Sequence, residues 1–155
     1  MKRIKASIVL FLLVFFFSNF FAQAQQGSEG DKILGLWEVG SKKARIKIFK
    51  SNDLYYGKIV WLKEPNYEDG TPKIDKNNPD EAKRNVRLLG YNNLKSFKYI
   101  GDNKWEEGTI YDPENGNTYS CAIALTDQNT LDVRGFIGVT LFGRTDTWIR
   151  LVVKK

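Results

Sequence analysis

The stretch KWEEGTIYDPENGNTYSCAIALTDQNTLDVRGF, residues 104–136, contains three strand-like runs separated by two turn sequences. Runs rich in β-branched and aromatic residues are typical of β-strands, and they predict strands over 104–111, 118–126 and 130–137. The first turn contains Asn115-Gly116, a pair that tolerates the positive φ angles of a tight hairpin. Because both connections are short, we expect these strands to be consecutive antiparallel neighbours.

The same pattern continues on both sides of this stretch. Further strands are predicted over residues 34–40, 44–50, 54–62, 94–100 and 144–152. The expected fold is therefore all-β, with about eight antiparallel strands in an up-and-down barrel. A closed barrel of about eight strands has no exposed sheet edges and can hold one small ligand.

One long connection, residues 63–87, interrupts the series of short turns. Connections longer than about 12–15 residues are usually functional or disordered, so a lid over the barrel is one expectation. Asp75 and Asn77 begin a sequence that resembles a calcium-binding loop, which makes a cation site the alternative. The glycine of such a loop is missing, however, and we expect Asx turns and one helical turn over 80–84.

The N-terminus has the pattern of a cleaved signal peptide. A basic start is followed by an apolar run over residues 6–21 and the small-residue site Ala22-Gln-Ala24, which predicts cleavage after Ala24. The run is shorter than the roughly 20 residues that a membrane-spanning helix needs. We therefore expect a signal peptide over 1–24, a single domain over 25–155, no stable membrane anchor after cleavage, and a periplasmic or extracellular location.

The composition argues against several classes of function. Without residues 1–24 the chain has 21 basic and 18 acidic residues, a formal charge of +3, and we expect no nucleic-acid partner. The absence of histidine removes the commonest general base and metal ligand. Cys121 is the only cysteine and lies in an apolar run, so we expect it to be buried and unreactive. We therefore expect no metal, no cofactor and no catalytic residues.

Several spaced motifs resemble the domain of unknown function 2147 family, which consists of small exported bacterial proteins. They are Gly35-Leu-Trp37, Gly57-Lys-Ile-Val-Trp-Leu62, Asp75-Lys-Asn-Asn-Pro-Asp80, Trp105-Glu-Glu-Gly-Thr-Ile-Tyr-Asp-Pro113 with Gly116 and Tyr119, Leu131-Asp-Val-Arg-Gly135, and Arg144 with Trp148-Ile-Arg150. This resemblance implies a secreted single domain and brings no established activity. The Gly-x-Trp motif and the late arginine are also similar to lipocalins, which implies a calycin-like barrel with Arg150 over Trp37.

The favoured function is binding of a small apolar or amphipathic ligand in the barrel mouth. The candidate ligand-binding residues are Lys58, Trp61, Trp105, Tyr111, Arg134 and Trp148. Alternation along two neighbouring strands further suggests that Arg134 pairs with Asp146, as a polar anchor if that face is interior and as a surface ion pair if it is exterior.

Two alternatives come from other classes of protein. The first is a module with a solid core that binds an envelope protein or a glycan. Trp61 and Trp105 are expected in a cavity for ligand binding and on the surface for the module. The second alternative is a glycan hydrolase, which needs two carboxylates facing one cleft. Its candidate acids are Glu106, Glu107, Asp112, Asp132 and Asp146.

Overall fold

The computed structural model describes residues 29–139 and 141–152, so the predicted signal peptide lies outside the described residues. The chain divides into two compact units, Met1–Lys32 and Ile33–Lys155, and all of the described strands belong to the second. They are β1 Gly35–Glu38, β2 Ala44–Ser51, β3 Leu54–Leu62, β4 Asn92–Gly101, β5 Lys104–Asp112, β6 Asn117–Asp127, β7 Thr130–Phe136 and β8 Gly143–Leu151. The described residues also contain two 3₁₀ helices, η1 Gly30–Ile33 and η2 Glu81–Lys83.

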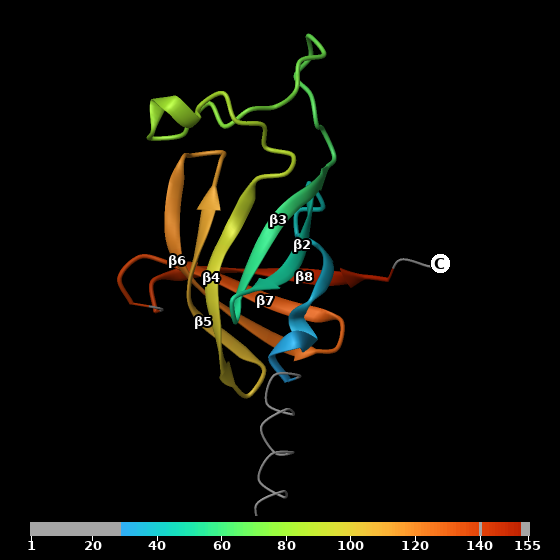
Figure 1. The fold of residues 1–155 in the computed structure, drawn as a ribbon, viewed down its shortest axis with the longest axis vertical. Coiled ribbons are helices and arrows are strands. Elements are labelled where there is room, and N and C mark those ends of the chain that lie inside the picture. Colours follow the sequence, from blue (N-terminus) through green and yellow to red (C-terminus); the bar gives the residue numbers. More distant parts are fainter. Residues whose placement is uncertain (1–28, 140, 153–155) are drawn as a thin grey trace, which may run out of the picture. The chain divides into compact units, whose positions relative to one another are not determined.

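The eight strands form one closed antiparallel barrel in chain order (Figure 1). Each strand pairs with its neighbour in sequence, and β8 closes the barrel against β1 with Trp37 opposite Arg150. The predicted all-β, up-and-down fold is therefore confirmed. Among the described residues there is no helix with the length and apolar character that crossing a membrane requires.

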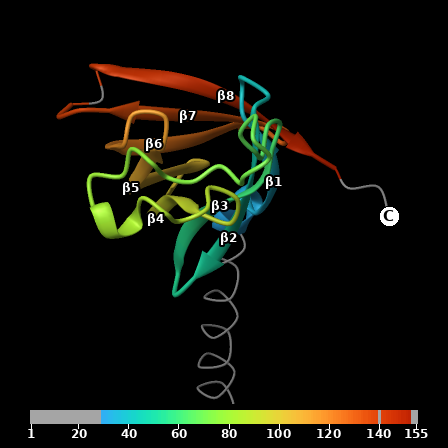
Figure 2. The same ribbon diagram turned by 90° about the horizontal axis from the view of Figure 1, so that it is seen from above.

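The two ends of the barrel differ because their connections differ. At one end, β2–β3 and β4–β5 are joined by two-residue turns, in which Asn52, Asp53, Asp102 and Asn103 have φ between 48° and 62°. Asn and Asp tolerate this left-handed conformation better than other side chains do. The opposite end carries the β1–β2, β5–β6 and β7–β8 connections and the long segment between β3 and β4 (Figures 1 and 2).

Trp37 and Arg150 join the first strand to the last, as the Gly-x-Trp motif predicts. The Arg150 guanidinium carbon lies 4.1 Å from the centroid of the Trp37 ring, a cation–π contact. Arg150 Nη1 donates to the Leu34 carbonyl at 2.8 Å, and Trp37 Nε1 donates to the Ile33 carbonyl at 2.9 Å. A Cβ atom on Gly35 would lie 2.9 Å from Arg150 Nη1, so a larger residue would displace this arginine.

Cys121 lies inside the barrel on β6, within the packed core. Its side chain is buried, and desolvation raises the pKa of its thiol to about 12. The thiolate is therefore scarce at neutral pH, as expected for a structural cysteine. Ser120, on the opposite face of β6, is exposed.

Candidate ligand-binding site

A cavity of about 1390 Å³ opens at the end of the barrel that carries the long connection. Apolar side chains from the inner faces of the strands form part of its wall, namely Ile46, Ile59, Ile110, Val133 and Trp148. The volume exceeds the roughly 300–1,000 Å³ of common small-molecule sites. The barrel therefore has space for a ligand at one end.

The cavity exists because residue size changes along the barrel interior. Trp37, Phe97 and Trp105 are buried and lie outside the cavity lining, so the interior beyond the cavity is filled with aromatic rings. At the open end, the inward positions on β7 hold Val133 and Gly135. A Cβ atom on Gly135 would meet only ordinary contacts, with Ile110 Cγ2 at 3.4 Å and Tyr119 Cβ at 3.7 Å. Small residues on this strand therefore leave open space.

Asn93 contributes a buried polar group to the cavity wall. It is 8 % exposed and lies where the pairing of β3 with β4 shifts register. Its Oδ1 atom has no hydrogen-bond partner among the described residues. Buried polar atoms are normally hydrogen-bonded, so this unpaired acceptor, which is closed off from solvent, is an exception.

Asp146 and Arg144 extend the polar lining along β8. Asp146 Oδ2 accepts a hydrogen bond from Trp148 Nε1 at 2.7 Å and one from the Gly40 backbone at 3.3 Å. Arg144, two residues earlier and exposed, pairs with Gly135 across the strands. No ion pair to Arg144 is present among the described residues. The carboxylate is thus occupied locally, whereas the guanidinium is available to an anion.

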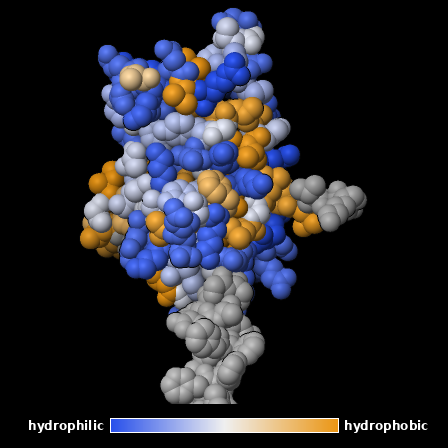
Figure 3. Space-filling model, viewed as in Figure 1, coloured by the Kyte–Doolittle hydropathy of each residue, from blue (hydrophilic) through white to orange (hydrophobic). Residues whose placement is uncertain are grey.

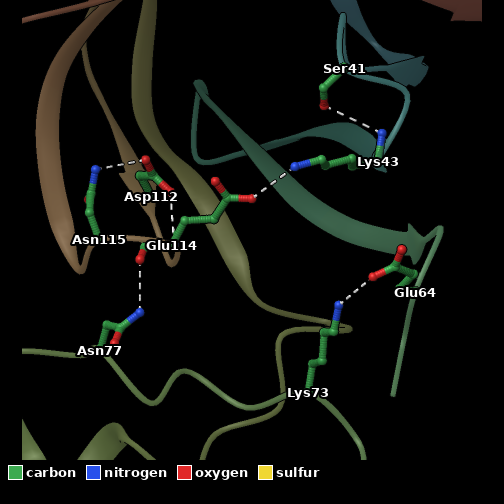
Figure 4. A network of polar contacts seen from close by, with 8 residues as sticks. All are labelled: Ser41, Lys43, Glu64, Lys73, Asn77, Asp112, Glu114 and Asn115. Atoms are coloured by element: carbon green, nitrogen blue, oxygen red, sulfur yellow. Dashed lines mark hydrogen bonds and ion pairs between the residues drawn. The ribbon is translucent and has the colours of Figure 1, made fainter. Parts of the chain in front are cut away.

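Ion pairs and hydrogen bonds connect the loops around the cavity (Figure 4). Lys43 Nζ lies 3.6 Å from Glu114 Oε1, and Lys73 Nζ lies 3.2 Å from Glu64 Oε2. Asn77 Nδ2 donates to the backbone carbonyls of Pro113 and Glu114, at 3.1 and 2.9 Å. The long connection is therefore tied to the β5–β6 turn.

The long connection, which runs from Lys63 to Tyr91, is anchored to the barrel by a buried carboxylate. Asp75 is fully buried, and its oxygens accept hydrogen bonds from Tyr111 Oη and Asn78 Nδ2, both at 2.6 Å. Burial and the hydrogen bond to Asp75 raise the pKa of Tyr111, so its hydroxyl remains a donor at physiological pH. The ring of Tyr91 lies 5.4 Å from that of Tyr111.

The predicted turn chemistry of this connection is confirmed. Asp80 caps the 3₁₀ helix Glu81–Lys83 by accepting from the Ala82 backbone at 3.1 Å. Asn78 Oδ1 likewise accepts from the Asp80 backbone at 2.9 Å. These oxygens serve the local backbone, and the described residues contain no group of three or more His, Cys, Asp or Glu side chains that could hold a metal ion.

Removing the Tyr111 hydroxyl is expected to loosen this anchor. We predict that Tyr111→Phe lowers the free energy of unfolding by about 1.5–3 kcal/mol, because a buried carboxylate loses a charge-assisted hydrogen bond. Urea denaturation measures the change, and amide hydrogen exchange is expected to accelerate in the long connection. The matched control is Tyr56→Phe, since Tyr56 stacks on Phe49 outside the cavity lining. Equal stability losses in both variants would contradict the anchoring role.

Two of the six residues predicted to bind ligand, Tyr111 and Trp148, line the cavity. Trp105 is fully buried in the core, where its ring meets Tyr55 and Tyr99. Neither the Trp61 ring nor the Trp105 ring lines the cavity, and only Trp61 is partly exposed. The positions of these two rings therefore do not distinguish a ligand-binding protein from an interaction module.

The other three predicted residues lie on the outer wall. Lys58 is exposed with its Nζ 5.7 Å from the Phe49 ring, and Trp61 is half-buried with the Arg45 guanidinium 4.3 Å from its ring. A bulge accounts for the outward position of Trp61, because the register of β2 with β3 shifts between Arg45 and Ile46. Arg134 donates to Thr145 Oγ1 at 3.0 Å.

The expected pairing of Arg134 with Asp146 is wrong. The register of β7 with β8 places Arg134 opposite Thr145 and Asp146 opposite Val133. Neighbouring residues on a strand point to opposite faces, so Arg134 lies outside and Asp146 lies inside. The strand boundaries were predicted well, but a shift of one residue in the pairing of β7 with β8 changes which side chains lie next to each other on the same face of the sheet.

The acids proposed for glycan hydrolysis are spread over the barrel. Asp112 and Asp146 line the cavity, while Glu106, Glu107 and Asp132 do not. Asp112 Oδ1 accepts from the Glu114 backbone at 2.9 Å, a turn contact. Asp146 is bonded to Trp148, as described above. The two proposed acids that line the cavity therefore serve the local structure. Glu64 and Glu114, which also line it, form ion pairs with Lys73 and Lys43.

Arg144 and Asn93 line the cavity but were not among the residues predicted to bind ligand, although Arg144 belongs to the family motifs. Alternation on β8 places Arg144 on the same face as Asp146 and Trp148, and this signal could have identified it. Asn93 lies at a register shift in β4, for which the sequence contains no clear signal.

A closed, eight-stranded antiparallel barrel with a cavity at one end defines a lipocalin-like barrel. The chain belongs to the family described as "Uncharacterized protein conserved in bacteria (DUF2147)", whose sequence profile matches residues 35–150. Among solved structures it is similar to protein HP1028 from the human pathogen Helicobacter pylori, described as belonging to the lipocalin family. That match has a TM-score of 0.68 and 24% identity and covers 77% of this chain and 83% of that chain. No curated protein matches the chain.

Proposed function

We propose that the protein is an exported, non-catalytic binding protein that holds a small amphipathic molecule in the mouth of its barrel. The observation that carries this proposal is the cavity of about 1390 Å³, with apolar walls and basic residues at its opening. Export is inferred from the N-terminal signal pattern.

The apolar part of the ligand is expected to lie between β2, β3, β5 and β7. Ile46, Ile59, Ile110 and Val133 face this space. Burial of apolar surface contributes roughly 25 cal/mol per Å², so a short alkyl chain or ring system gains enough to bind with useful affinity. Neutral apolar molecules alone would leave the polar groups of the wall without partners.

The polar part of the ligand is expected to be anionic. Lys63, Lys76 and Arg144 line the opening, and none of them has an ion pair among the described residues. Arginine binds carboxylates and phosphates through paired N–H groups, which makes Arg144 the favoured contact.

The alternatives have less support from the geometry. An interaction module with a solid core does not require open space in the barrel, and a hydrolase requires two converging acids that are free to react. The open volume and the local bonding of Asp112 and Asp146 both favour ligand binding.

Native mass spectrometry tests the proposal directly. The purified protein is incubated with a bacterial lipid extract, separated from free lipid and sprayed under non-denaturing conditions. A retained species of defined mass is the expected result. If every tested extract leaves only the mass of the protein itself, the binding role is contradicted.

Replacing Arg144 separates the anionic contact from apolar binding. We predict that Arg144→Gln weakens binding of lauric acid about tenfold, as loss of one charge-assisted contact would, and leaves binding of 1-dodecanol nearly unchanged. Fluorescence displacement or calorimetry measures both affinities. Lys58→Gln is the matched control, since Lys58 lies on the outer wall, and it is expected to change neither affinity. An equal loss for acid and alcohol in Arg144→Gln would contradict the assigned contact.

A further inference from the structure

The connection between β7 and β8 exposes a cluster of large apolar side chains. Ile137, Val139, Leu141 and Phe142, which we call the apolar tip, are 73, 59, 78 and 74 % exposed. Figure 3 shows hydrophobic atoms at the left edge of the molecule, where this connection lies in Figure 1. Clusters of this kind on a soluble domain mark surfaces that bind a partner or a membrane.

The cluster stands out from the rest of the described surface. No other strand or connection has more than two exposed large hydrophobics, and only Val152, at the end of β8, is as exposed. Single exposed apolar side chains are normal and need no explanation. The apolar tip alone combines four of them within one connection.

Local contacts at the base of the connection hold the tip. Arg134 Nη2 donates to the Leu141 carbonyl at 3.2 Å, and the Phe142 backbone donates to the Val139 carbonyl at 3.1 Å. Gly143 fits closely here, because an added Cβ atom would lie 2.7 Å from the Gly135 carbonyl oxygen. These contacts fix the connection in a shape that presents its side chains to the outside.

The charges beside the tip favour an anionic surface. From Asp132 to Asp146 the sequence contains two arginines, Arg134 and Arg144, and an aspartate at each end. Both aspartates accept hydrogen bonds within the barrel, from Thr147 Oγ1 at 2.8 Å and from Trp148 Nε1 at 2.7 Å. Arg144, by contrast, has no ion pair among the described residues. A basic residue near an anionic membrane contributes about 1 kcal/mol, and aromatic residues such as Phe142 favour the interface. A stable protein interface needs about 20–30 residues on each side, far more than this tip supplies.

We propose that the apolar tip docks the protein reversibly on an anionic phospholipid surface, with Ile137, Leu141 and Phe142 inserted among the lipids. These three residues also line the cavity opening, so docking brings the opening to the lipid. The proposal does not depend on ligand binding, because the tip is exposed in the protein without a ligand.

Co-sedimentation with vesicles tests the docking. The protein is mixed with vesicles of phosphatidylglycerol and phosphatidylcholine, or of phosphatidylcholine alone, with no other ligand added. We expect binding to the anionic vesicles that weakens as salt is raised, and little binding to the neutral ones. Leu141→Asp and Phe142→Asp are each expected to lower the affinity for anionic vesicles at least tenfold.

Val152→Asp is the matched control, because Val152 is 78 % exposed, as Leu141 is, and lies at the other end of β8. It is expected to bind vesicles as the unmodified protein does, and thermal melting checks that all three variants are folded. Failure of the unmodified protein to bind anionic vesicles would overturn the proposal, and so would unchanged binding by both tip variants. A concentration-dependent dimer that Leu141→Asp dissociates, without vesicle binding, would instead assign the tip to a second copy of the chain.

Discussion

Trp37→Ala is expected to lower the free energy of unfolding by about 3–5 kcal/mol, the range typical of truncating a buried tryptophan. Trp37 is fully buried, and its loss removes the surface on which Arg150 stacks. The same substitution removes the hydrogen bond to the Ile33 carbonyl. Because β1 and β8 meet at this residue, we expect the barrel to open at this seam first.

Chemical denaturation of Trp37→Ala and Trp61→Ala provides a matched comparison. Trp61 is half-buried on the outer wall under Arg45, so its truncation is expected to cost only about 1 kcal/mol. Amide hydrogen exchange in Trp37→Ala should accelerate most in β1 and β8. Similar losses for the two variants would show that the β1–β8 seam has no special role in stability.

Gly135→Trp is expected to reduce the affinity for lauric acid at least tenfold, because the indole would project into the cavity from β7. The Gly135 backbone needs no positive φ angle, and a Cβ atom there meets only ordinary contacts, so the variant should fold. Loss of binding would then follow from lost space and not from a disrupted strand.

Ser120→Trp is the control for Gly135→Trp. Ser120 is exposed on β6 and pairs with Phe136, so the same large side chain is added outside the barrel. Titration with lauric acid should give the affinity of the unmodified protein for Ser120→Trp. If Gly135→Trp also retains that affinity while both variants keep the melting temperature, the ligand does not occupy this cavity.

Local sequence signals predicted the strands, because strand formation depends largely on residues that are neighbours in the sequence. Alternating apolar residues and Asn, Asp and Gly turns placed all eight strands, and the Gly-x-Trp motif placed Trp37 against Arg150. The family resemblance is likewise confirmed by the match over residues 35–150.

Register and inward-facing positions depend on pairing between strands, and here the sequence was insufficient. Val60 has no partner on β2, because Ile59 pairs with Ile46 and Trp61 pairs with Arg45. This bulge turns Trp61 outward. Arg134 and Asp146 were placed side by side because alternation alone does not determine which residues face each other. For the same reason only Tyr111 and Trp148 were placed correctly at the cavity, while Arg144 was not among the residues predicted to bind ligand.

A crystal structure of the protein with lauric acid tests the central claim most directly. We expect an alkyl chain between Ile59, Ile110 and Val133, with the carboxylate within hydrogen-bonding distance of Arg144. A ligand bound only on the outer wall, or a cavity that stays free of lauric acid at saturating concentration, would contradict it.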